Sequence, residues 1–321
     1  MTAIGAVVAV WLAAAPSPEG FKEKMGEAIG RHDAGDYPGA MKIYRSLLVE
    51  RPHDPNVVYE LSLSMMMGKA PPNEMISFIE GELKHNGKHL PQLYATLAAA
   101  YDTNTQFTRG EAILRQGLQV APDNVDLLFN LGVNLMMQDK PVEAEPPLKK
   151  AVQLKPQWSA VWRTLSLTLE ANHKQLDAFL VKARFVAMEA NTSRGKTAAQ
   201  DLMPLLMHGV EKTLHRIDVN VGKGAKDIGI NLVAATRWSG HEKESDGEFF
   251  VYALGQVVNL AFESKPDPFR KFVLAMFEAA KKDGVLVPLG WMLMRSAGDA
   301  NADRWFATHR KEEAKLEAFF N

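Results

Sequence analysis

The chain of 321 residues is long enough for two structural units, and its 46% of hydrophobic side chains excludes wholesale disorder. Its 37 basic and 38 acidic side chains leave a net charge of −1, which argues against a nucleic-acid partner because such partners usually require a basic excess. The absence of cysteine excludes disulfides, thiolate catalysis and cysteine-ligated zinc.

The first element along the chain is the apolar run AIGAVVAVWLAAA at residues 3–15. This run is too short to span a bilayer but has the length of the hydrophobic region of a signal peptide, and its last three alanines suit a cleavage site. However, no basic residue precedes it, since the first is Lys22. Residues 1–20 are therefore expected to be either a signal peptide or an N-terminal cap. We favour the signal peptide, which places the mature chain in the periplasm or outside the cell, whereas a cap leaves it in the cytoplasm. No other segment predicts a transmembrane helix.

The clearest helical pattern lies in residues 125–158, where two short amphipathic segments flank a turn. Large and small side chains alternate on one face of each segment: Leu128, Leu131, Gly132, Leu135, then Ala144, Leu148 and Ala151. Pro156 ends the second segment. Such alternation lets two helices approach closely and stack on their neighbours, as in a repeat protein.

This unit resembles the tetratricopeptide repeat (TPR), whose period is about 34 residues. The same template recurs in 21–54 and 91–124, and in weaker form in 55–90 and 159–192. The closing residues Pro122 and Pro156 are one period apart. The resemblance covers residues 21–192 and implies an all-α fold, a right-handed helical solenoid whose usual role is to bind other proteins.

Residues 193–321 match no family that we recognise, but they also predict helices. The expected helices cover 198–216, 249–262, 269–282 and 302–320. The last of these carries an aromatic stripe expected to be buried against the domain. The fold class is therefore a TPR-type solenoid followed by a helical C-terminal region.

The concave face of a solenoid is lined mainly by the first helix of each repeat. In the second and fourth repeats, the side chains expected on that face are apolar and rich in methionine, which suits an adaptable peptide-binding groove. The groove residues are Tyr59, Leu63, Met66, Met67, Phe129, Val133, Met136 and Met137. The competing interpretation is that they belong to the core, which is the commoner fate of such stripes.

Motifs for catalysis and cofactor binding are incomplete. Gly195-Lys196-Thr197 ends a phosphate-loop pattern, but the earlier glycine is replaced by Ala190, and the glycines around 222–224 lack the third member of a dinucleotide fingerprint. We interpret both stretches as turns. His208, His215 and His241 do not have the spacing of metal ligands. We therefore expect no cofactor, no metal and no catalytic residue.

Three hypotheses follow. The first, which we favour, is a non-catalytic scaffold or adaptor that binds a peptide or helix of another protein in the groove, without nucleic acid and without a transmembrane anchor in the mature chain. The second is an enzyme, or a substrate-recruiting subunit, with an active site in 193–321. The third is a structural adaptor in a larger assembly. Enzymes need convergent polar groups in a pocket, and the composition of 193–321 is mainly apolar with scattered charges.

Overall fold

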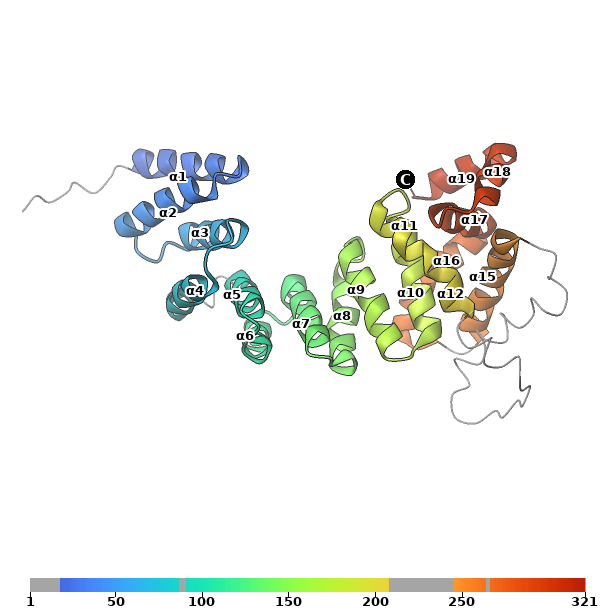
Figure 1. Cartoon of the computed structure of the whole chain (residues 1–321), viewed down its shortest axis with the longest axis horizontal. Coiled ribbons are helices and arrows are strands. Elements are labelled where there is room, and N and C mark those ends of the chain that lie inside the picture. The colour runs from blue at the N-terminus through green and yellow to red at the C-terminus, as the bar shows by residue number, and fades with distance from the viewer. Residues whose placement is uncertain (1–17, 87–90, 208–244, 264–265, 321) are drawn as a thin grey trace, which may run out of the picture. The chain divides into compact units, whose positions relative to one another are not determined.

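The structure is a computed structural model that describes residues 18–86, 91–207, 245–263 and 266–320. All regular elements in these ranges are helices, which confirms the all-α prediction (Figure 1). The chain forms two compact units, Met1–Asn130 and Leu131–Asn321, and the sequence boundary between them falls inside one helix. The sequence-based division at 192/193 stays a prediction.

The first unit contains six complete helices and the start of a seventh. They are α1 (Pro18–Asp33), α2 (Tyr37–Glu50), α3 (Pro55–Met67), α4 (Pro72–Asn86), α5 (Gln92–Thr103), α6 (Phe107–Val120) and the start of α7 (Val125–Met137). Within the unit, α1 packs on α2, α2 on α3, α4 on α5 and α5 on α6. The side chains that fill its core come from the faces with large and small residues in alternation, such as Ala40, Tyr44 and Leu47 of α2, which have no exposed surface.

The second unit contains the end of α7, followed by α8 (Pro141–Leu154), α9 (Ser159–Ala171) and α10 (Gln175–Met188). Gly132 of α7 faces Leu148 of α8, and a Cβ added to this glycine would lie 2.4 Å from the Leu148 Cγ. Only a glycine allows the two helices to come this close. The small residue that marks the repeat in the sequence is therefore required by packing in the structure.

The turn inside each helix pair has one residue in the left-handed region, at the same place in every repeat. These residues are Gly35, Lys69, Thr105, Asp139 and His173, with φ of 80°, 53°, 57°, 57° and 56°. They are 34 residues apart, except for one step of 36 between Lys69 and Thr105. The period of the backbone geometry therefore agrees with the sequence period, although glycine occupies only the first of the five positions.

Two local features define where helices begin. Asp36 and Asp54 cap α2 and α3, since the Asp36 carboxylate accepts a hydrogen bond from the Gly39 N–H and the Asp54 carboxylate accepts from the N–H groups of Asn56 and Val57. Proline occupies the first turn of α2, α3 and α8, where its missing N–H costs nothing. In α8, however, Pro146 and Pro147 lie inside the helix and remove two backbone hydrogen-bond donors.

Next to these prolines, the side chain of Glu145 contacts the turn of the following helix pair. The buried Glu145 carboxylate accepts hydrogen bonds from Asn172 and Lys174 of the α9–α10 turn at 2.8 Å, and pairs with Lys149 at 2.7 Å. Burial raises the pKa of Glu145, but the hydrogen bonds from Lys149, Lys174 and Asn172 outweigh it and make the net shift of this pKa downward. The ionised carboxylate thus joins α8 to the next helix pair.

The remaining helices of the second unit form the C-terminal region. They are α11 (Ser193–Gln200), α12 (Leu202–Met207), α15 (Asp246–Glu263), α16 (Pro268–Lys282), α17 (Leu286–Ser296), α18 (Ala300–Thr308) and α19 (Arg310–Phe320). Of these helices, α11, α12, α16 and α17 pack directly on α10 of the fifth helix pair. Phe272 stacks on Trp162 of α9 with ring centres 5.8 Å apart, and the buried Arg270 pairs with Asp177 of α10 at 2.6 Å.

The prediction of a continuous helix over 198–216 is wrong, because α11 ends at Gln200 and α12 begins at Leu202; the residues from 208 onward lie outside the described part of the chain up to residue 244. The prediction of a single helix over 302–320 is also wrong, because α18 and α19 are separated at His309. The His309 Nδ1 lies 2.9 Å from the Trp305 carbonyl oxygen, and its ring stacks on Trp305 with centres 4.2 Å apart. This local arrangement ends α18 and turns the chain. The expected burial of the aromatic stripe is also incomplete, since Phe320 is 44% exposed. Among the described helices, none combines the length and the apolar character that crossing a membrane requires.

Candidate binding surfaces

The groove residues of the second repeat lie along α3 in the first unit. Tyr59 and Leu63 are half-buried, whereas Met66 and Met67 are 37% and 52% exposed. Phe129, at the start of α7 in the same unit, is also half-buried. These five side chains thus keep part of their apolar surface open instead of being enclosed in the core.

The other three groove residues belong to the second unit. Val133 and Met136 of α7 are half-buried, and Met137 is 55% exposed. A groove that joins all eight residues would span both units and stays a prediction.

Two acidic side chains, Glu60 and Asp126, lie near enough to Tyr59 to act on its charge. Desolvation raises the pKa of the Tyr59 hydroxyl, and the carboxylates of Glu60 and Asp126 raise this pKa further. The pKa of Glu60 is itself raised, chiefly by desolvation, with His32 opposing the shift and Asp33 adding to it. The α3 face therefore combines apolar side chains with a negative potential near Tyr59, which is an electrostatic feature that the apolar stripe in the sequence did not reveal.

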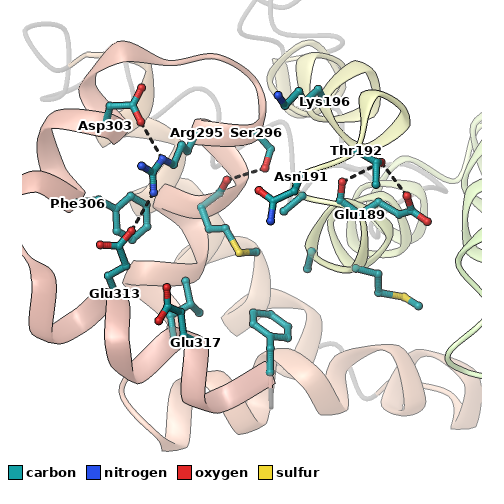
Figure 2. A pocket seen from close by; sticks show the side chains of 16 residues that line it. Glu189, Asn191, Thr192, Lys196, Arg295, Ser296, Asp303, Phe306, Glu313 and Glu317 are labelled. Atoms are coloured by element: carbon teal, nitrogen blue, oxygen red, sulfur yellow. Dashed lines mark hydrogen bonds and ion pairs between the residues drawn. The ribbon is translucent and has the colours of Figure 1, made fainter.

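A cavity of about 650 Å³ in the second unit was not predicted from the sequence. Figure 2 shows its lining, which comes from the turn between α10 and α11 on one side and from α17, α18 and α19 on the other. The segments that meet here are separated by about a hundred residues of chain. No local motif could reveal such a site, because it depends on how the C-terminal helices pack against the fifth repeat.

Glu189 organises the α10–α11 wall. Its buried carboxylate accepts hydrogen bonds from the hydroxyls of Ser159 and Thr192 and pairs with Arg194 at 2.8 Å. The hydroxyl of Ser159 contributes most to the lowering of the pKa of Glu189, followed by Thr192. Gly195 permits this arrangement, since a Cβ there would lie 2.0 Å from the Glu189 carbonyl oxygen. The Gly195-Lys196-Thr197 stretch lies within α11, and the turn expected there is wrong.

Arg295 organises the opposite wall. Its guanidinium pairs with Asp303 at 2.8 Å and with Glu313 at 2.9 Å, and lies 5.0 Å from the centre of the Phe306 ring. Arg310 adds a second bond to Glu313 at 2.7 Å. Burial raises the pKa of Glu313, but Arg310 and Arg295 together outweigh it, so that the net shift of this pKa is downward. Glu313 is therefore held between two arginines in this wall.

The described residues contain no group of three or more His, Asp or Glu side chains placed to hold a metal ion. His208, His215, His241 and the glycines at 222–224 lie outside the described residues, as does the apolar run at 3–15.

No protein-family profile and no curated protein sequence matches this chain. Several solved structures, in contrast, match part of the chain. PilF of Pseudomonas aeruginosa is 13% identical, with 65% of this chain and 96% of that chain covered and a TM-score of 0.52. TTC0263, described as a thermophilic TPR protein of Thermus thermophilus, is 16% identical over 56% of this chain and 98% of its own, with a TM-score of 0.46. YrrB, described as a TPR protein with an unusual peptide-binding site, is 13% identical over 58% of this chain and 98% of its own, with a TM-score of 0.45. At these identities the likeness concerns the fold alone.

Proposed function

Since this chain has the fold of a TPR helical solenoid, we propose that it is a non-catalytic scaffold or adaptor that binds a peptide or helix of another protein. The observation that carries this proposal is the exposure of three methionines on the first helices of two repeats. Met66, Met67 and Met137 are 37%, 52% and 55% exposed. Open apolar side chains of this size on a preformed surface suit the capture of an apolar segment.

The partner segment is amphipathic or extended and carries apolar anchors. Methionine side chains are flexible and polarisable, so they adapt to anchors of different shape. The acidic groups Glu60 and Asp126 near Tyr59 favour a basic residue beside the anchor that contacts α3. Neither a nucleic-acid partner nor a cofactor is part of this proposal.

The alternative of an enzyme with its site in 193–321 has less support. The cavity between α11 and α19 holds acidic side chains, but Glu189 and Glu313 are fixed by hydroxyl groups and by arginines, and their pKa values are lowered. A general acid or base at neutral pH needs a pKa closer to 7. These carboxylates are therefore better suited to holding helices together than to transferring protons.

Photo-crosslinking in the native host tests the proposed function. A photoreactive amino acid replaces Met67 or Met137, and in the control variant it replaces Val49, which is 83% exposed on the second helix of the first repeat. We expect the two methionine positions to crosslink to the same protein and the Val49 position not to. Equal crosslinking from all three positions, or from Val49 alone, would contradict binding through the first helices.

We also propose that residues 1–15 are removed on export, which places the mature chain in the periplasm or outside the cell. The support is the length of the apolar run and its small final residues. Intact-mass measurement on protein purified from fractionated native cells tests this proposal. A cytoplasmic chain that retains Trp11 would refute it.

A further inference from the structure

The cavity between α11 and α19 differs from the groove, with which it shares no residue. It is lined within the second unit by described residues, and its volume of about 650 Å³ lies in the range of sites that enclose a ligand or a group of side chains. Most of its charged groups are already satisfied. Glu189 is held by Ser159 and Thr192, and Arg295 is held by its two carboxylates.

Two charged side chains of the lining remain available. Lys196 of α11 and Glu317 of α19 are exposed and have no hydrogen-bond or ion-pair partner among the residues that the structure describes. They come from opposite walls, as Figure 2 shows. The cavity thus presents one unpaired positive and one unpaired negative charge that a single occupant could contact.

Apolar surface is also available in the same lining. Met188, at the end of α10, is 36% exposed, and Phe320, at the end of α19, is 44% exposed. Met292 of α17 contributes further half-buried apolar surface. An occupant that buries these side chains gains roughly 25 cal/mol for each Å² of apolar area removed from water.

We propose that this cavity binds a short segment of a partner protein in which an apolar side chain has an acidic residue on one side and a basic residue on the other. The apolar side chain packs against Met188 and Phe320, the acidic residue pairs with Lys196, and the basic residue pairs with Glu317. Because the two charges stand on opposite walls, they select the direction in which the segment lies as well as its composition.

A reciprocal charge exchange tests the proposal on the full chain. A phage-displayed library of random peptides is selected on the wild type and, separately, on the double variant Lys196→Glu/Glu317→Lys. Both positions are exposed, so the variant should retain the wild-type melting temperature. Selected peptides are synthesised, and their affinities for both proteins are measured by fluorescence polarisation.

The wild type should select peptides with an apolar residue between an acidic and a basic one, and these should bind the double variant about tenfold less tightly. The variant should select the opposite charge order. A control variant, Met67→Glu, changes the groove and not the cavity, so it should leave the affinities of these peptides unchanged. A failure of the proposed groove can thus be distinguished from a failure of the proposed cavity site.

Three outcomes would overturn the inference. The first is that the selected peptides bind both proteins with equal affinity. The second is that their affinities respond to Met67→Glu and not to the charge exchange. The third is concentration-dependent dimerisation of the wild type that the charge exchange abolishes, which would mean that a second copy of the chain occupies the cavity.

Discussion

The close approach of α7 and α8 predicts that a single methyl group at Gly132 destabilises the second unit. In Gly132→Ala, the new Cβ would lie 2.4 Å from Leu148 Cγ and 2.5 Å from Leu148 Cδ2. Leu148 has no exposed surface, so its side chain cannot turn outward into solvent to make room. Overpacking of this kind costs about 1–3 kcal/mol of unfolding free energy, and contacts as short as these place the cost at the upper end of that range. Alanine recovers about 1 kcal/mol of helix propensity. The expected net loss is therefore about 2 kcal/mol.

Thermal unfolding measured by circular dichroism is the assay. A loss of about 2 kcal/mol should lower Tm by roughly 4–8 °C in a unit of this size. Gly255→Ala is the matched control, since it lies within α15 of the same unit and, among the residues that the structure describes, no atom beyond its own helix backbone lies within 4 Å of the position that its new Cβ would occupy. This variant should gain stability by helix propensity alone, by about 0.5–1 kcal/mol.

A double-mutant cycle with Leu148→Ala identifies the contact. Each single substitution should destabilise, because Leu148→Ala leaves a cavity that costs about 2–5 kcal/mol. The methyl group of Gly132→Ala would partly fill that cavity, so the double variant should be more stable than the sum of the singles by about 1 kcal/mol or more. If Gly132→Ala is as stable as the wild type, or if the two effects simply add, the packing of α7 on α8 described above is wrong.

Further predictions concern the groove, the turns and acid stability. Tyr59→Ala and Phe129→Ala should weaken binding of the crosslinked partner by about 2 kcal/mol or more, with a smaller loss of unfolding free energy, as titration calorimetry and melting measured together can show. Thr105→Gly should stabilise by about 1 kcal/mol because a β-branched residue is strained at φ 57°, whereas Gly35→Thr at the equivalent turn should destabilise by about 1–2 kcal/mol; equal Tm values would contradict the strain. The lowered pKa of Glu189 provides stability that is present above the unfolded-state pKa of about 4.3 and lost as the pH falls through the folded-state pKa, so the Tm of Glu189→Gln should fall less between about pH 5 and pH 3 than that of the wild type.

The repeat was predictable because its signals are local and recur. Positions such as Gly132 and Pro156 mark a helix pair wherever they stand in phase, and the backbone repeats with the same spacing. Other features were not predictable, because they depend on contacts between distant segments. Phe320 follows a helical stripe like any buried aromatic, yet it remains exposed at the rim of a cavity. The break at His309 was missed for a different reason: the stacking of its ring on Trp305 is a local contact, but a stretch of good helix formers predicts one continuous helix.

The apolar character of α10 explains why the C-terminal helices pack on the last helix pair of the solenoid. The second helix of a repeat usually buries one face, as α6 does with Gly110, Leu114 and Gly117. In contrast, α10 has the sequence QLDAFLVKARFVAM, which is apolar almost all round, and ten of its 14 residues are buried. A helix of this kind needs neighbours on every side. Its packing with α9, α11, α12, α16 and α17 provides them. The C-terminal helices therefore act as the cap that a solenoid needs at its end, and the cavity between α11 and α19 arises where this cap begins.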